Sequence, residues 1–87
     1  MIQKKVVVRL KSGIHILPAT ELAKICGQHN CKARIFFKNY EINVNSILNI
    51  LSATINCGDE LLLVCDGEEE EMVLNALEDV LTSDEVE

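Results

Sequence analysis

The sequence predicts an α+β fold: a four-stranded antiparallel sheet with three helices on one face. Strand-like and helix-like segments alternate in the order β-α-β-β-α-β-α along 87 residues, the length of one small domain (residues 1–87). The hydrophobic fraction of 48% is enough for a single core. With two Phe, one Tyr and no Trp, that core must consist mostly of Leu, Ile and Val.

The first strand is expected from Lys4 to Leu10, because three consecutive valines lie between charged residues. Gly13 then supplies a tight turn, where a positive φ costs it little. A helix is expected from about Ile16 to Gly27, where apolar residues recur at helical spacing and form one face: Ala19, Leu22, Ala23 and Cys26.

Two strands with one buried face each follow, from Cys31 to Lys38 and from Tyr40 to Val44. A tight turn at Lys38 and Asn39 joins them, with Asn39 expected in the left-handed conformation. The alternation directs one set of side chains inward: Ala33, Ile35, Phe37, Tyr40, Ile42 and Val44.

Ser46 is a good cap for a short second helix. Helical spacing turns Ile47, Ile50 and Leu51 inward and places Leu48 off that face.

The strongly apolar segment from Glu60 to Cys65 predicts a central strand that is paired on both sides. Glu68–Glu71 open the last helix, where acidic residues suit the positive end of the helix dipole. Its core stripe is expected to consist of Val73, Leu74, Leu77, Val80 and Leu81. Ser83 to Glu87 form an acidic tail that we expect to fray.

The net charge of −6 comes from 14 acidic residues against 8 Lys and Arg. This balance disfavours nucleic acid and anionic membranes as partners, because binding to both depends on a basic surface. The start of the chain lacks a signal-peptide pattern, and no apolar run is long enough to span a bilayer. We therefore expect a cytoplasmic protein that is not inserted in a membrane.

The four cysteines show no Cys-x-x-Cys pair, and neither histidine lies at zinc-ligand spacing. We expect reduced thiols and no metal or cofactor. Two cysteines, Cys31 and Cys57, are expected near loops, where reactivity stays open.

His15 is the main candidate for chemistry. Gly13 before it and Pro18 after it place it at or just before the start of a helix, because Pro fits the first helical turn. The free amides of that turn and the helix dipole favour negative charge. An imidazole there can accept a phosphoryl group and pass it on. The alternative is a histidine that caps the helix or lies in a loop.

Two separated motifs, Gly13-Ile14-His15 with Pro18-Ala19 and the segment from Ile42 to Leu48 with Leu51-Ser52, resemble the HPr family. This family comprises the histidine-containing phosphocarriers of the bacterial phosphotransferase system, and the resemblance covers nearly the whole chain. It implies an open-faced β-sandwich in which the first and fourth strands are adjacent in the middle of the sheet. It also implies a phosphocarrier rather than a stand-alone enzyme.

By this resemblance, His15 accepts a phosphoryl group from phospho-Enzyme I and passes it to a sugar-specific Enzyme IIA, supported by Ile16, Leu17 and Pro18. Leu17 departs from the family, which usually has an arginine there. Leucine cannot provide the charge-assisted grip of arginine on a phosphate. The alternative is therefore an HPr-like regulatory binding protein with weak or no transfer.

The resemblance also implies that Ser46 corresponds to the serine that an HPr kinase phosphorylates. The role of an ordinary helix cap explains Ser46 equally well. The resemblance further implies a set of partner-docking residues: Thr20, Lys24, Ile47, Leu48 and Leu51. We expect the protein to be a monomer.

Overall fold

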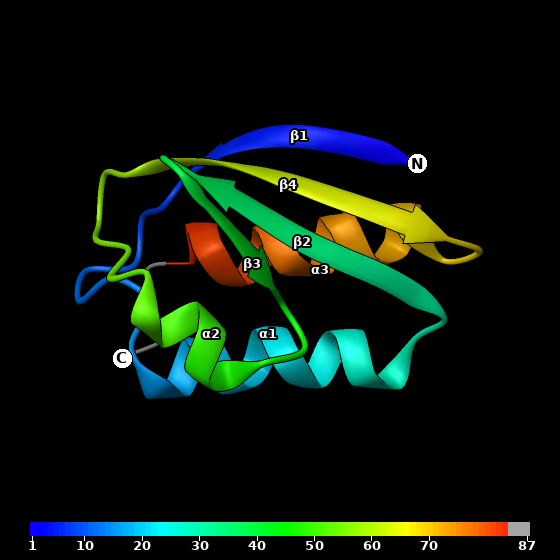
Figure 1. Ribbon diagram of the computed structural model, residues 1–87, viewed down its shortest axis with the longest axis horizontal. Helices are drawn as coiled ribbons and strands as arrows, with labels where there is room; N and C mark the ends of the chain where they lie inside the picture. The colour runs from blue at the N-terminus through cyan, green and yellow to red at the C-terminus, as the bar shows by residue number, and fades with distance from the viewer. Residues whose placement is uncertain (84–87) are drawn as a thin grey trace.

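The computed structural model describes residues 1–83 (Figure 1). Seven elements follow the predicted order β-α-β-β-α-β-α. They are β1 (Ile2–Val7), α1 (Ile16–Gln28), β2 (Cys31–Phe37), β3 (Tyr40–Asn43), α2 (Ile47–Ser52), β4 (Glu60–Gly67) and α3 (Glu70–Thr82).

The four strands form one antiparallel sheet in the order β1-β4-β2-β3. The prediction that the Glu60 strand is central is confirmed, because β4 pairs with β1 on one side and β2 on the other. The expectation that the first strand also lies in the middle is wrong. β1 is adjacent to β4 but lies at the edge, and the central pair is β4 and β2.

All three helices cover one face of the sheet, as predicted (Figure 1). Helix α3 packs against β1, β4 and β2, while α1 packs against α3 and α2. The predicted alternation in β2 is confirmed, with Ala33, Ile35 and Phe37 buried. Together with the apolar faces of the helices, these side chains form a single core that is mostly aliphatic.

Strand β1 ends at Val7 rather than at Leu10. Beyond Val7 the chain turns toward the end of α3. The Val8 amide donates to the Asp59 carbonyl, and the Arg9 amide donates to the Leu81 carbonyl at 2.9 Å each. Val8 and Leu10 are still buried. The apolar pattern therefore predicted their burial correctly but wrongly extended the strand to include them.

Helix α1 runs through Gly27 and ends at Gln28, one residue later than predicted. In the turn between β2 and β3, Lys38 and not Asn39 has a positive φ, of 54°. Tyr40 is not buried as expected but is 54% exposed, because it is the first residue after the turn of this hairpin, opposite Phe37.

Strand β3 ends at Asn43, while β4 continues past Cys65 to Gly67. Helix α3 begins at Glu70, with Glu69 as its N-cap, and most of its predicted stripe is buried. The predicted fraying of the tail lies outside the described residues, apart from Ser83. Within residues 1–83, no helix is both long enough and apolar enough to cross a membrane.

Candidate functional site

His15 is the N-cap residue of α1, with extended backbone angles of φ −94° and ψ −167°. Its carbonyl accepts the first helical hydrogen bond, from the Ala19 amide at 3.0 Å. The imidazole is partly buried and makes no capping hydrogen bond to the helix. The predicted position of His15 is therefore confirmed, and a capping role for its ring is not supported.

The loop before His15 is held by backbone contacts. Gly13 has a φ of 70°, as predicted, and a Cβ at this residue would come within 2.5 Å of the Ile55 carbonyl oxygen. The same carbonyl accepts a hydrogen bond from the Ile14 amide at 2.9 Å. The sequence does not indicate this support, because Ile55 is forty residues away and acts through its main chain.

The first turn of α1 has unused capacity for negative charge. Pro18 is the third helical residue and is buried, and it has no amide hydrogen to donate. The amides of Ile16 and Leu17 precede the point at which an α-helix provides acceptors. This turn contains no acidic residue, so the positive end of the helix dipole has no carboxylate of its own to interact with.

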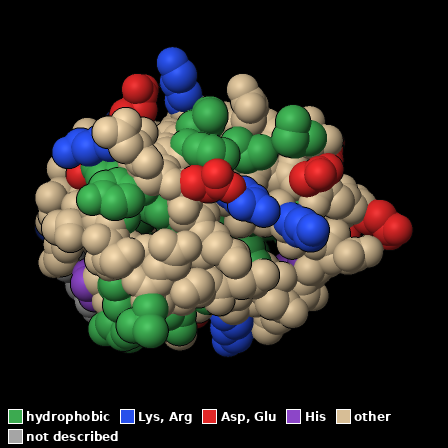
Figure 2. Space-filling view, viewed as in Figure 1, with side chains coloured by type: hydrophobic (Ala, Val, Ile, Leu, Met, Phe, Trp, Pro, Cys, Tyr) green, Lys and Arg blue, Asp and Glu red, His purple; other side chains and the backbone are tan. Residues whose placement is uncertain are grey.

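Apolar side chains surround this helix start. Ile16 and Leu17 are each 54% exposed, and Leu48 on the neighbouring α2 is 80% exposed, as its position off the core face predicts. Figure 2 shows hydrophobic side chains gathered beside a histidine at the end of the molecule where α1 begins. Ile47 and Leu51 are only partly buried, and they pack against the core. Five predicted residues thus lie on two helices that pack together.

Two further predicted docking residues lie along the exposed side of α1. The Thr20 hydroxyl donates to the Ile16 carbonyl at 2.7 Å, so it is already engaged within the helix. Lys24 is exposed, nine residues after His15, which corresponds to about 13 Å along the helix axis. Lys24 therefore lies well away from the first turn, where the family's arginine would stand.

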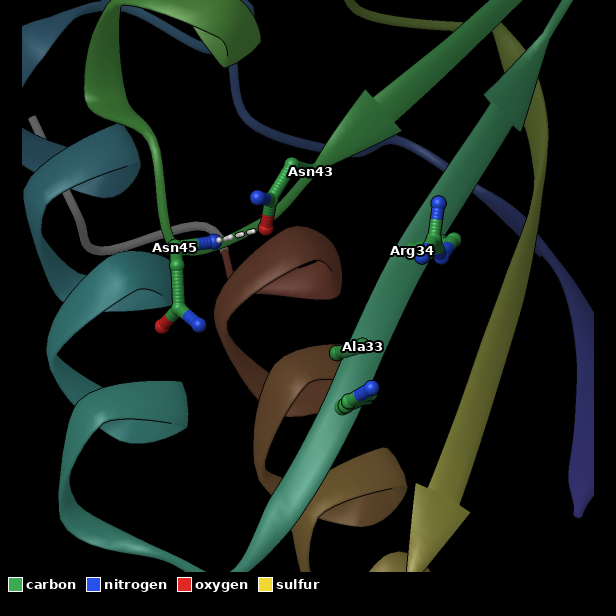
Figure 3. Close-up of a pocket in the computed structure, with 5 residues that line it drawn as sticks. Ala33, Arg34, Asn43 and Asn45 are labelled. Carbon is green, nitrogen blue, oxygen red and sulfur yellow. Dashed lines mark hydrogen bonds between the residues drawn. The ribbon is translucent and has the colours of Figure 1, made fainter.

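Ser46 is the N-cap of α2, and its hydroxyl oxygen accepts a hydrogen bond from the Asn49 amide at 3.1 Å. Three asparagines hold the segment before it. The Asn43 side-chain oxygen accepts from the Asn45 amide at 3.0 Å, and the Asn49 side-chain oxygen accepts from the Asn43 amide at 2.8 Å. Figure 3 shows this turn beside a pocket between β2 and the segment that follows β3, with the Asn45 side chain pointing away from Asn43. The predicted cap is confirmed.

The second histidine is not part of this site. His29 follows the last residue of α1, at the opposite end of the helix from His15. Its Nδ1 lies 3.4 Å from a carboxylate oxygen of Glu69. Among residues 1–83, no three His, Cys, Asp or Glu side chains lie close enough together to hold a metal ion.

The sequence matches the family model described as "PTS HPr component phosphorylation site" over residues 2–83. The chain belongs to the HPr family. HPr proteins are phosphocarriers of the phosphotransferase system and are not themselves enzymes. The family assignment agrees with the resemblance that the two sequence motifs indicated.

Two curated HPr relatives support this assignment. The chain is 30% identical over 78 residues to the phosphocarrier protein HPr of Treponema pallidum (strain Nichols), which covers 90% of this chain and 89% of that protein. It is also 30% identical over 77 residues to the HPr-like protein Crh of Bacillus subtilis (strain 168), covering 88% and 91%. Among solved structures, HPr from Bacillus anthracis str. Ames superposes with a TM-score of 0.87 at 28% identity, covering 92% of this chain and 95% of that one. The open-faced β-sandwich is thus the HPr fold.

Proposed function

We propose that this protein accepts a phosphoryl group on His15 from phospho-Enzyme I and passes it to a sugar-specific Enzyme IIA. The observation that carries the proposal is the imidazole at the N-cap of α1, which makes no capping hydrogen bond and adjoins a first turn without acidic residues. An imidazole is both a good nucleophile and a good leaving group near neutral pH, so it suits a transient carrier.

The helix start would stabilise the phosphorylated state only modestly. A negative charge near a helix N-terminus gains about 0.3–1 kcal/mol from the dipole. The amides of Ile16 and Leu17 are free of helical acceptors and would supply hydrogen bonds to the phosphoryl oxygens. A weak hold suits a carrier, because the phosphoryl group must leave again in the next step.

The exposed apolar side chains of Ile16, Leu17 and Leu48 would form the contact surface for both protein partners. We assign Ile47, Leu51, Thr20 and Lys24 to the edge of this surface. Enzyme I and Enzyme IIA would bind it in turn, each bringing its reactive group to His15.

The deciding experiment is incubation of the purified protein with Enzyme I and phosphoenolpyruvate, followed by intact-mass analysis at alkaline pH. We expect a gain of one phosphoryl group that is lost in His15→Ala. The matched control is His29→Ala, which removes the other histidine and should still be labelled. An acid-labile phosphate that persists in His15→Ala would rule out this site.

A second function, regulatory binding with weak transfer, is favoured by one specific residue. Leu17 occupies the first turn of α1 with an exposed apolar side chain, and one relative is the HPr-like protein Crh. In this case Ser46, at the start of α2, would be the controlling residue, phosphorylated by an HPr kinase.

Labelling by Enzyme I and by HPr kinase, run side by side, separates the two functions. A carrier gains phosphate on His15 from Enzyme I, and Ser46→Asp then weakens its docking to Enzyme I. A regulator is labelled on Ser46 by the kinase while His15 stays unmodified.

A further inference from the structure

Three of the four cysteines gather where α1 ends and β2 begins. Cys26 lies in the last turn of α1, Cys31 is the first residue of β2, and Cys65 lies in β4. In the β2–β4 ladder, Ala33 is opposite Cys65 and Cys31 is opposite Gly67. Cys31 and Cys65 are therefore diagonal neighbours, and strand alternation directs both toward the helices.

The three thiols differ in their access to solvent. Cys26 and Cys65 are buried, whereas Cys31 is partly exposed. Cys31 lines a groove together with Cys26, His29, Lys32 and other residues, and Figure 2 shows a hollow with a histidine inside it below Lys and Arg side chains. A small oxidant from solvent therefore reaches Cys31 before it reaches the other two thiols.

Cys65 is the thiol that is in place to react next. It is the diagonal neighbour of Cys31 across the β2–β4 ladder, on the same face of the sheet. Burial raises the pKa of Cys65 to about 12 and that of Cys26 to about 11, so both remain protonated thiols at neutral pH.

We propose that Cys31 and Cys65 form a redox-sensitive pair that a hydroperoxide converts into a disulfide between β2 and β4. The Cys31 sulfur attacks one peroxide oxygen, the O–O bond breaks, and the thiol proton leaves with the other oxygen as water or an alcohol. The Cys65 sulfur then attacks the resulting sulfenic acid, and its proton leaves with the hydroxyl group as water. Two thiols lose two electrons and two protons, and one peroxide is reduced.

This site is separate from the phosphoryl site. Cys26, beside the pair, lies eleven residues after His15 on one helix, about 16 Å along its axis. Oxidation of the pair should therefore leave phosphoryl acceptance at His15 unchanged, and failure of either inference does not affect the other.

The test is treatment of the folded protein with hydrogen peroxide, followed by alkylation of the remaining thiols and intact-mass analysis. We expect a monomer in which two thiols have lost their hydrogens, so that it carries two alkyl groups fewer than the reduced and alkylated protein and recovers both after dithiothreitol. Cys31→Ser should abolish this loss, whereas the exposed Cys57→Ser should retain it and serves as the matched control.

Peptide mapping identifies the pair without altering the core. Trypsin cuts after Lys24 and Lys32, so Cys26 and Cys31 share one peptide, while Cys57 and Cys65 share another. In oxidised Cys57→Ser, a link between these two peptides that involves Cys31 is the expected result. A link within the first peptide, a Cys26–Cys65 link, over-oxidation of Cys31, or no loss of hydrogens would overturn the proposal.

Discussion

Helices α1 and α3 are both 13 residues long and follow similar glycine turns, yet they differ in charge at their starts. The first turn of α3 contains acidic residues, and the first turn of α1 contains none. Each is preceded by a glycine with positive φ, Gly13 or Gly67, and a Cβ at either glycine would come within 2.5 Å of a backbone oxygen. Tight backbone packing therefore fixes the approach to both helices.

The start of α3 carries carboxylates of its own, with Glu69 as the N-cap residue and two further acidic residues in the first turn. Glu69 accepts a hydrogen bond from the Asn30 amide at 2.9 Å, and Glu70 accepts one from the Gly67 amide and contacts the N-terminal amine at 3.1 Å. These bonds hold the pKa of both carboxyl groups below the usual value. The start of α1 has no such partners, so its dipole remains available to a phosphoryl group that arrives from outside. In our proposal, the same helix geometry serves stability at the start of α3 and phosphoryl binding at the start of α1.

Substituting alanine for Gly13 or Gly67 tests whether the segments before α1 and α3 depend equally on a glycine. Gly13→Ala and Gly67→Ala should each lower the free energy of unfolding by about 2–3 kcal/mol, because alanine disfavours positive φ and its Cβ meets backbone. Urea unfolding measures this. Only Gly13→Ala should also slow phosphoryl acceptance, since Gly67 precedes α3. Equal slowing in both variants would mean that general loosening, not the His15 loop, limits transfer.

Charged residues at position 17 test whether the start of α1 limits the rate of phosphoryl acceptance. Leu17→Arg should raise the rate of phosphoryl acceptance about tenfold, or about 1.4 kcal/mol, because a guanidinium forms charge-assisted bonds to phosphate. Leu17→Glu should lower it by a similar factor, since it gives α1 a carboxylate like those of α3. Leu17→Gln is the uncharged control, measured in the same Enzyme I assay. Identical rates in all three variants would show that the helix start does not limit transfer.

The cap of α2 offers a smaller test. Ser46→Ala should reduce the free energy of unfolding by about 1 kcal/mol, because the Asn49 amide loses its acceptor. Ser52→Ala removes an exposed hydroxyl at the other end of α2 and should cost less. Thermal unfolding compares the two. If they are equal, the cap contributes little and Ser46 is free for another role.

The acidic start of α3 should produce a mild pH dependence. Glu69 and Glu70 have lowered pKa values in the folded state, so their contribution to stability is present above pH 4.5 and is lost as the pH falls through the folded-state pKa values. Glu69→Gln with Glu70→Gln should therefore lower the Tm at pH 7 and flatten its fall below pH 4.5. Glu71→Gln, in the same turn, is the control and should keep the wild-type profile.

The sequence by itself determined the local features. Alternation in β2, the helical stripe of α3, the positive φ of Gly13, the cap at Ser46 and the position of His15 all depend on residues within a few positions of one another. Propensity, periodicity and turn chemistry act over that range, so the pattern alone was enough. The motifs around His15 and Ser46 also pointed to the family.

Only the tertiary structure decided which distant segments meet. It placed β1 at the edge of the sheet, brought the Ile55 carbonyl under Gly13, and set Cys65 beside Cys31. It also ended strand pairing after Val7, because the Arg9 amide donates its hydrogen bond to the Leu81 carbonyl at the end of α3. These arrangements result from competition among pairings across the whole chain, and a short-range pattern carries no information about that competition.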